Sequence, residues 1–417
     1  MTKSSWNKLP LKALFRLDTT SCLPASQPEQ AFLHHSIPAW DESGGPVVEL
    51  GNTIGSNKFL ISHACVLVSK LNPRKSRVSV VRDLHGEFRQ CASTEFMLYV
   101  PIHEDADIEF YSWYMKSECF RSELERVATG TTNSHVRLPP KETLNWKIAH
   151  PPLPEQHRIA EILDTIDEAI QKTEALISKL KAMKQGLLQD LLTRGLDKND
   201  KLRDPKAHPE QFKDSTLGRT PKEWQVVSIG KISRVRRGAS PRPIDNPVWF
   251  AQEGRGWIRI SDVTRANGLL KETEQYLSSA GVNKSVSVYP GQIIMSICAT
   301  IGEPIILDMN ACIHDGFVVF DQYDEFMCPE FFIHFLRSKQ SYFRSQGQTG
   351  TQANLNTNIV KDCFIGLPIL TEQKNIAKCL DSHDARIRTE EQYSDKLKLQ
   401  KKGLMHDLLT GKVRVEV

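Results

Sequence analysis

The stretch that decides the fold is Pro-Leu-Pro-Glu-Gln-His-Arg-Ile-Ala-Glu-Ile-Leu-Asp-Thr-Ile-Asp at residues 152–167, which runs on to Gln-Asp-Leu-Leu-Thr-Arg-Gly-Leu at residues 189–196. Residues 155–193 match residues 372–410 without a gap, at a constant offset of 217 residues and with 19 identities in 39 positions. Two unrelated helices would not keep register for so long. The chain therefore contains an internal repeat.

Each copy of the repeat has the pattern of a long helix. In the first copy, apolar residues recur at steps of three and four from Ile159 to Leu191, as on a helix face that packs on another helix. Pro152 and Pro154 mark the start, because proline disfavours a helix interior, and Gly195 suits the C-terminal end. At about 1.5 Å per residue, such a helix is about 55–60 Å long.

We expect the two helices to pair antiparallel as a coiled coil, with a remaining apolar face available to partners. A helical hairpin that only holds the chain together is an alternative. The residues predicted to pair the helices or to dock a partner are Ile159, Leu163, Ile166, Ile170, Leu180, Leu187, Leu191, Ile376, Leu380, Ile387, Leu397, Leu404 and Leu408.

The duplication extends beyond the helices, because Trp224 follows Trp6 at an offset of 218 residues and similar apolar residues follow both. The sequence thus predicts an α+β protein in which two mixed α/β domains alternate with two long helices, in a pseudo-twofold repeat. The predicted parts are a first domain at 1–150, a helix at 151–196, a linker at 197–220, a second domain at 221–366 and a second helix at 367–417.

Within the domains, apolar and β-branched residues predict strands at 59–68 and 78–81, and helical spacing predicts a helix at 108–128. Residues 256–264 alternate like a strand, which would place Arg259 and Ser261 on one face.

Composition excludes several classes of protein. Of 417 residues, 40% are hydrophobic and 25% are charged, as in ordinary globular domains, and the net charge of +4 permits a nucleic-acid partner. The nine cysteines show no Cys-x-x-Cys spacing and no signal peptide is evident, so we expect reduced thiols, no zinc site and a cytoplasmic protein. No run approaches 18 apolar residues, so no membrane span is expected.

Signatures of bond chemistry are missing from the sequence. There is no phosphate-binding Gly-x-x-x-x-Gly-Lys loop, no Gly-x-Gly-x-x-Gly and no His-Glu-x-x-His. The motifs of amino-group methyltransferases and the common nuclease pattern are also missing. We therefore expect a chain without catalytic residues, metal or bound cofactor.

Binding signals are stronger, since both domains carry a basic group. Arginine and lysine neutralise phosphates, whereas arginine, asparagine and glutamine read base edges. A basic run can also be a solvated surface, but two groups at apparently equivalent places in a duplicated chain favour a shared ligand. The predicted DNA-binding residues are Lys70, Asn72, Arg74, Lys75, Arg77, Arg234, Arg236, Arg237, Arg242, Arg259, Ser261, Gln352 and Asn354.

These residues resemble a known family. Pro-Leu-Pro-Glu-Gln-His-Arg-Ile-Ala-Glu-Ile-Leu-Asp at 152–164, together with residues 184–195, resembles the central conserved region of the DNA-specificity subunit of type I restriction–modification systems. Residues 401–412, the copy of 184–195, resemble that family's second conserved region. In the second domain, Trp257-Ile-Arg-Ile-Ser-Asp-Val-Thr264 and Cys312-Ile-His-Asp-Gly-Phe317 resemble that family's target recognition domains. An Ile-Ser-Asp-Val element is not evident in the first domain.

The resemblance implies a non-catalytic subunit that binds a bipartite, asymmetric sequence in double-stranded DNA, with one half-site per domain. It implies that the helices space the domains and dock two modification (methyltransferase) subunits, and that restriction (motor-endonuclease) subunits join this core. S-adenosylmethionine, ATP and Mg²⁺ would then belong to the partners.

Two rival hypotheses come from other classes. One is a coiled-coil adaptor that binds proteins and has no sequence-specific DNA affinity. The other is a restriction enzyme that acts alone, against which the missing methyltransferase and nuclease motifs argue.

Overall fold

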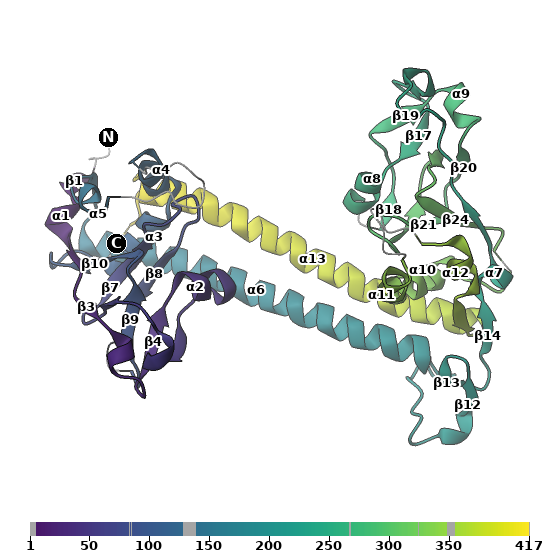
Figure 1. Ribbon diagram of the computed structural model, residues 1–417, viewed down its shortest axis with the longest axis horizontal. Helices are drawn as coiled ribbons and strands as arrows, with labels where there is room; N and C mark the ends of the chain where they lie inside the picture. The colour runs from purple at the N-terminus through teal and green to yellow at the C-terminus, as the bar shows by residue number, and fades with distance from the viewer. Residues whose placement is uncertain are drawn as a thin grey trace. The chain divides into compact units, whose positions relative to one another are not determined.

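The computed structural model describes residues 6–82, 84, 86–127, 139–266, 268–323, 325–347 and 355–416. The chain forms two compact units (Figure 1). The first unit contains residues 1–175 and 391–417, and the second unit contains residues 176–390. Each unit therefore holds one α/β domain and part of both long helices.

The two predicted long helices are present. Helix α6 spans Leu153–Thr193 and helix α13 spans Leu370–Leu409, 41 and 40 residues respectively. Pro154 lies in the first turn of α6, where its missing N–H costs no hydrogen bond. Gly195 and Gly411 follow the helices with φ of 62° and 72°, a left-handed conformation that glycine adopts without strain.

The helices pair antiparallel within each unit, as predicted (Figure 1). In the first unit, Ile159 and Leu163 at the start of α6 share a core with Leu408 at the end of α13. In the second unit, Leu191 at the end of α6 shares a core with Ile376 at the start of α13. The start of one helix thus packs beside the end of the other in both units.

All of the residues predicted to pair the helices are at least half-buried. Ile166, Leu187 and Leu404 are half-buried. The other ten are buried, namely Ile159, Leu163, Ile170, Leu180, Leu191, Ile376, Leu380, Ile387, Leu397 and Leu408.

Two ion pairs follow the repeat along the helices. Asp167 binds Lys401 in the first unit, and Lys184 binds Asp384 in the second. Asp384 is the copy of Asp167 and Lys401 is the copy of Lys184 at the offset of 217, so each ion pair repeats the other. Met183, which the apolar pattern includes, is instead 51% exposed.

Among its described residues, the first domain has two sheets, a short strand pair and five α-helices, with 3₁₀ turns at Pro24–Ser26 and Gly51–Thr53. One sheet has the order β2 (Phe15–Asp18), β10 (Phe96–Pro101), β7 (Cys65–Ser69), β8 (Val78–Val81). The other has the order β3 (Ser21–Cys22), β6 (Lys58–Leu60), β9 (Arg89–Ser93), β4 (Ala31–His35), β5 (Val47–Leu50). The remaining elements are β1 (Asn7–Pro10) paired with β11 (Lys147–His150), and α1 (Leu11–Leu14), α2 (Ile37–Ser43), α3 (Ile108–Lys116), α4 (Glu118–Val127) and α5 (Pro140–Thr143).

The second domain repeats this plan with additional strands, and has 3₁₀ turns at Pro209–Gln211 and Pro247–Trp249. One sheet has the order β15 (Arg234–Arg237), β24 (Phe317–Asp321), β21 (Ile293–Ser296), β22 (Pro304–Leu307), β18 (Leu269–Leu270). The other has the order β16 (Phe250–Ala251), β19 (Gln275–Leu277), β17 (Arg255–Ile258), β23 (Ala311–Ile313), β20 (Val286–Val288). The remaining elements are β14 (Gln225–Ser228) paired with β25 (Phe364–Leu367), β12 (Phe212–Ser215) paired with β13 (Gly218–Pro221), and α7 (Ile229–Ile232), α8 (Ile260–Arg265), α9 (Ser279–Val282), α10 (Pro329–Ser338), α11 (Gln340–Ser345) and α12 (Thr357–Asp362).

The strand pairings make the two domains equivalent. The antiparallel series β2-β10-β7-β8 matches β15-β24-β21-β22, and the parallel pair β4–β9 matches β17–β23. Helix α2 follows β4 as α8 follows β17. The first domain therefore does contain a counterpart of the Ile-Ser-Asp-Val element, at the start of α2, although its sequence there is Ser36-Ile-Pro-Ala39.

Three predicted elements differ in detail. The strand predicted at 59–68 is two strands, β6 and β7, and the helix predicted at 108–128 is broken at Ser117 into α3 and α4. The predicted linker 197–220 contains most of the β12–β13 hairpin. In the part of the chain that the structure describes, no helix combines the length and apolar character of a membrane span.

A buried glutamine joins each domain to the start of its helix. The Gln156 side chain donates to the carbonyls of Asp105 and Pro151, both at 2.8 Å, and accepts from the Asp107 backbone N–H at 3.0 Å. Gln373, its copy, repeats these three bonds with Phe326, Pro368 and Cys328. Both glutamines are fully buried, so these bonds are shielded from water.

The preceding glutamate joins the same helix to a tryptophan and an arginine. Glu155 accepts from Trp6 Nε1 at 2.9 Å and from both Arg414 Nε and Nη2 at 2.6 Å. Burial alone would raise the pKa of the Glu155 carboxyl, but the bonds from Arg414 and Trp6 outweigh it and hold the pKa below its ordinary value.

The copy, Glu372, accepts from Trp224 Nε1 at 3.2 Å, from the Leu196 N–H at 2.8 Å and from Arg203 Nη1 at 2.6 Å. Glu372 and Arg203 are both buried, with side chains 7% exposed. We name each Glu-Gln pair with its partners a Glu-Gln clamp, at 155–156 and at 372–373.

We expect Glu372→Gln to lower the free energy of unfolding by about 3–5 kcal/mol, because it leaves the buried Arg203 guanidinium without its main countercharge. Urea unfolding followed by circular dichroism measures the loss. The control is Glu168→Gln on α6, which breaks only the exposed pair with Lys172 and should cost less than about 0.5 kcal/mol. Equal losses in the two variants would contradict the structural role of the clamp.

Candidate nucleic-acid interface

The turn between β23 and β24 gathers side chains from β15 and the segment that follows it. We call His314, Asp315 and Gly316 the Asp315 turn. The Asp315 carboxylate accepts from Ser240 Oγ at 2.6 Å and pairs with Arg242 Nη2 at 3.2 Å, and its backbone carbonyl accepts from Arg237 Nε at 2.8 Å. Two of the predicted arginines therefore meet at one turn, and the Arg242 side chain is 70% exposed there.

Burial and neighbouring charges determine the protonation states of His314 and Asp315, the two titratable side chains of the turn. Burial lowers the pKa of His314 to about 4, and nearby Arg259 adds to this, so the ring is neutral at pH 7. Nδ1 of His314 accepts from the Gly316 N–H at 2.9 Å, which leaves the proton on Nε2 as a donor. Burial would raise the pKa of Asp315, but the bond from Ser240 and the charge of Arg242 keep it below its ordinary value.

The strand predicted at 256–264 is wrong beyond Ile258. Helix α8 begins at Ile260, because the Asp262 carboxylate accepts from the Arg259 N–H at 2.9 Å and caps the first turn. Arg259 therefore precedes a helix and the exposed Ser261 lies in its first turn, so they do not share a strand face. Arg259 still lies near the Asp315 turn, because the parallel pairing of β17 with β23 places Ile258 opposite Ile313.

Arg234 and Arg236 are held elsewhere. Arg234 and Arg236 share one face of β15, opposite Arg237, and both bind the buried Asp321 carboxylate, Arg234 Nε at 2.8 Å and Arg236 Nη2 at 2.6 Å. Burial would raise the pKa of Asp321, but these two bonds lower it instead. The two arginines are 50% and 35% exposed, so one positive charge in excess faces the surface at this position.

In the first domain, the predicted basic residues follow β7. The Lys70 N–H donates to the Glu95 carbonyl at 2.9 Å, in the β9–β10 turn that is equivalent to the Asp315 turn. Asn72 has φ of 48° and opens a tight turn, closed by the Lys75 N–H at 3.0 Å from the Asn72 carbonyl. Arg74 and Lys75 are exposed on this turn.

Arg77 does not fit the prediction of a DNA contact. Its side chain is 5% exposed, and Nε and Nη2 each bind a carboxylate oxygen of Asp41 at 2.8 Å, while Nη1 donates to the Leu71 carbonyl at 3.1 Å. Lys75 Nζ also approaches Asp41, at 3.6 Å. A buried guanidinium with this set of partners holds the loop against α2 and is not open to a ligand.

The sequence suggested that the two basic groups occupy equivalent places in the two domains. The structure shows that they do not. The β7–β8 loop of the first domain corresponds to the β21–β22 loop of the second. In contrast, Arg237 ends β15, the equivalent of β2, and Arg242 follows that strand. Both groups nevertheless lie beside the equivalent turn, since Lys70 contacts the β9–β10 turn and Arg237 the β23–β24 turn.

The predicted residues Gln352 and Asn354 lie outside the described residues. The chain is described again from Leu355, whose N–H donates to the Ile297 carbonyl at 2.8 Å. The Ile297 N–H in turn donates to the Gly316 carbonyl at 2.8 Å, so Leu355 is anchored beside the Asp315 turn.

Sequence reasoning missed Ser240, His314 and Asp315. Two glycines were an available signal. A Cβ on Gly238 would lie 2.0 Å from the His314 carbonyl oxygen, and one on Gly316 would lie 2.4 Å from Cys298 Sγ. Gly238 is required because two backbone segments meet there, whereas a Cβ on Gly316 would displace the side chains of Cys298 and His314.

Among the described residues, two groups of side chains lie close enough together to bind a metal ion. They are His103, Asp105 and His150 in the first unit, and His334, Asp381 and Asp384 in the second. Both are poor ligand sets. Nδ1 of His103 accepts from the Asp105 N–H, which puts the ring proton on Nε2, and Asp384 already binds Lys184. That the chain binds no cofactor stays a prediction.

Known proteins are similar to this chain in sequence. A sequence model of the type I restriction modification DNA specificity domain matches residues 55–182 and 221–399. The type I restriction enzyme MjaVIII specificity subunit of Methanocaldococcus jannaschii is 28% identical over 324 residues, 74% of this chain and 70% of the relative. The type I restriction enzyme EcoBI specificity subunit of Escherichia coli is 26% identical over 203 residues, 46% of this chain and 40% of the relative.

Solved structures show the same fold. A chain from a study of complex assembly and conformational transition of the type I R-M system has a TM-score of 0.60 at 19% identity and covers 98% of both chains. The S subunit of the type I restriction–modification system from M. genitalium has a TM-score of 0.59 at 13% identity, over 98% of this chain and 97% of that one. With the sequence model matching well over half of its residues, the chain belongs to the family of the type I restriction modification DNA specificity domain.

Proposed function

We propose that this chain is the DNA-specificity subunit of a type I restriction–modification complex. It binds a bipartite, asymmetric DNA sequence, with one half-site for each domain. The observation that carries the proposal is the repeated architecture around one turn. Both domains place basic residues beside the β9–β10 turn or its copy, the Asp315 turn, but they do so with different loops. Equivalent positions with different side chains suit two half-sites of different sequence.

The side chains at the Asp315 turn are suited to contact DNA bases and phosphates. The Asp315 carboxylate orients Arg242 while leaving most of its guanidinium exposed, and an oriented guanidinium suits guanine edges or phosphates. Neutral His314 adds an N–H donor at Nε2. Such groups read a duplex without forming or breaking bonds, so the proposed role is non-catalytic.

Partner subunits would supply the chemistry. We propose that the long helices dock two modification subunits, which bind S-adenosylmethionine, and that restriction subunits using ATP and Mg²⁺ join them. Support comes from the relatives, which are named as specificity subunits of restriction enzymes, and from the solved relative that belongs to an assembled type I system.

A coiled-coil adaptor without sequence-specific DNA binding explains the structure less well. Such an adaptor would need the paired helices, but it gives no reason for the oriented arginines at the Asp315 turn or for the family match across both domains.

Removing the charge at Arg242 should weaken DNA binding by the assembled complex. We expect Arg242→Ala to weaken affinity for the cognate duplex by about five- to a hundredfold, and to lower the dependence of log K on log salt by about one if the contact is to phosphate. Anisotropy titrations at several salt concentrations measure both. Arg158→Ala, which removes one exposed charge from α6, is the control. Unchanged affinity and slope in Arg242→Ala would remove this residue from the interface.

Replacing residues 221–366 with the second domain of another family member should change one half-site of the methylated sequence and leave the other intact. Each domain has its own sheets and its own basic group, so each domain should recognise its half-site independently of the other. Methylome sequencing of a host carrying the chimera gives the result. Altered bases in both half-sites would count against one domain per half-site.

Shortening both helices by one heptad should shorten the unread spacer. Deleting 174–180 with 388–394 keeps the Asp167–Lys401 and Lys184–Asp384 pairs in register. Seven residues correspond to about 10 Å of helix, or about three base pairs of duplex. Methylome sequencing should show a spacer shorter by about that amount with both half-sites unchanged. A spacer of the original length would show that the helices do not set it.

A further inference from the structure

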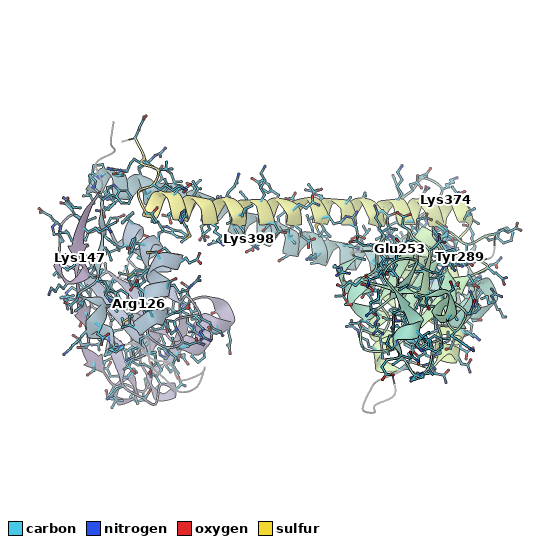
Figure 2. The ribbon with its side chains drawn as sticks, turned by 90° about the horizontal axis from the view of Figure 1, so that it is seen from above. Arg126, Lys147, Glu253, Tyr289, Lys374 and Lys398 are labelled. Carbon is cyan, nitrogen blue, oxygen red and sulfur yellow. The ribbon has the colours of Figure 1, made fainter. Side chains whose placement is uncertain are left out.

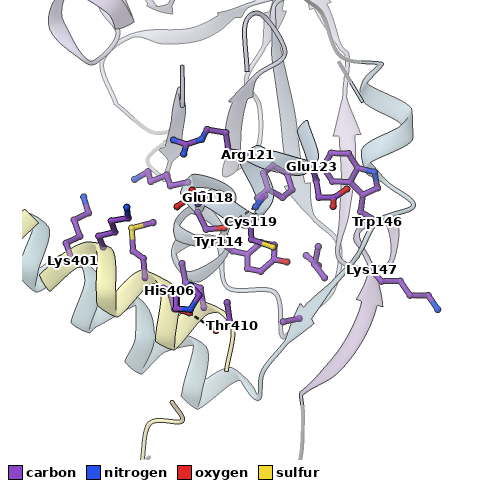
Figure 3. A pocket seen from close by; sticks show the side chains of 18 of the residues that line it. Tyr114, Glu118, Cys119, Arg121, Glu123, Trp146, Lys147, Lys401, His406 and Thr410 are labelled. Carbon is purple, nitrogen blue, oxygen red and sulfur yellow. Dashed lines mark hydrogen bonds between the residues drawn. The ribbon is translucent and has the colours of Figure 1, made fainter. Parts of the chain in front are cut away.

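The first unit has a groove of about 850 Å³ between α4, β11 and the last turns of α13 (Figure 3). We call it the first-unit groove. All of the described residues that line it belong to β1, α3, α4, β11, α13 or the residues beside them. Its apolar lining includes Tyr114, Phe120, Trp146, Met405 and Leu409, and its cationic lining includes Lys8, Lys116, Arg121, Lys147, Lys398, Lys401 and Lys402.

The second unit has the equivalent groove. Gln185, Gln189 and Thr193 of α6 line it, and these are the copies of Lys402, His406 and Thr410 in the first-unit groove. Residues of α10 replace those of α3 and α4, and Gly366 replaces Ala149. We call this the second-unit groove. Its volume is about 260 Å³, less than a third of the other.

The β12–β13 hairpin occupies part of the second-unit groove. Leu217, Arg219 and Thr220 of this hairpin form part of the second-unit lining, and Leu217 Cδ1 would lie 3.9 Å from a Cβ placed on Gly366. The chain thus covers the second-unit groove with its own hairpin, whose leucine packs beside Gly366. Among the described residues, the first-unit groove has no hairpin in its lining.

The two grooves also differ in the charge of their lining residues. Lys402 stands where the second unit has Gln185, and Lys147 stands where it has Phe364. Lys398 binds Glu174 and Lys401 binds Asp167, but Lys8, Lys147 and Lys402 have no ion pair with a described residue. Lys147 and Lys398 extend from β11 and α13 (Figure 2). Glu118 and Glu123 also line the groove, but its cationic side chains outnumber them, so the first-unit groove keeps an excess of positive charge beside its apolar side chains.

We propose that the first-unit groove binds a segment of a partner protein that carries one large aliphatic side chain between acidic residues. The aliphatic side chain takes the place that Leu217 has in the second unit, and the acidic residues neutralise Lys8, Lys147 and Lys402. The apolar lining disfavours a nucleic acid backbone as the occupant. The hairpin of a second copy is also disfavoured, since Lys213, Arg219 and Lys222 would meet like charge. The proposal is independent of DNA recognition.

The test uses a fluorescent, cyclised peptide with the sequence of residues 210–222 and the changes Lys213→Glu, Arg219→Glu and Lys222→Glu. Anisotropy should show binding at one site of the full-length protein, weakening as salt rises. Lys402→Glu in the protein should weaken binding at least tenfold. The matched control is Gln185→Glu at the equivalent position of the second-unit groove, which should leave the affinity unchanged. Leu217→Ser in the peptide should abolish binding.

A photo-crosslinking group in place of Leu217 in the peptide should attach to residues 114–123 or 398–410, as mass spectrometry would show. Thermal unfolding of Lys402→Glu at the wild-type temperature confirms that the variant is folded. The proposal is overturned if the peptide does not bind, if Gln185→Glu weakens binding as much as Lys402→Glu, if the unchanged basic sequence binds as tightly as the acidic one, or if the crosslink lies elsewhere.

Discussion

The buried Glu-Gln clamp at the start of each long helix is the constraint on which the structure depends. Gln156 and Gln373 bind backbone groups of their own domains, while Glu155 and Glu372 bind a tryptophan before the domain and an arginine beyond the other helix. Each clamp therefore joins three separate parts of the chain at one point. Together with the core that Ile159 or Ile376 shares with its domain, the clamp orients the start of the helix relative to the sheets that carry the basic residues.

The paired helices add a second constraint, which is register. The Asp167–Lys401 pair and its copy, Lys184–Asp384, are satisfied together because the helices run antiparallel. A shift of one heptad would separate both pairs and bring unlike neighbours together, at a cost that apolar residues alone would not impose. The polar positions along the seam thus select one alignment among several that the leucines and isoleucines would accept.

Sequence reasoning predicted the helices and their pairing, because a heptad pattern that occurs twice leaves few alternatives. It failed where short patterns are ambiguous. Residues 256–264 alternate like a strand, but the cap that Asp262 provides starts a helix at Ile260. Arg77 looks like part of a basic loop until Asp41 on α2 is brought beside it. The Asp315 turn was missed because its members come from segments about 75 residues apart, which only the strand order unites.

The copied ion pairs have an evolutionary consequence. Asp167 and Lys184 lie on one helix, and their partners are the same two residue types at matching positions of the other. A polypeptide of half the length, with one domain and one helix, could satisfy both pairs by forming a twofold-symmetric homodimer with an isologous interface. Its two identical domains would read a palindrome. Gene duplication and fusion would then have freed each domain to diverge, and so replaced palindromic targets with asymmetric ones.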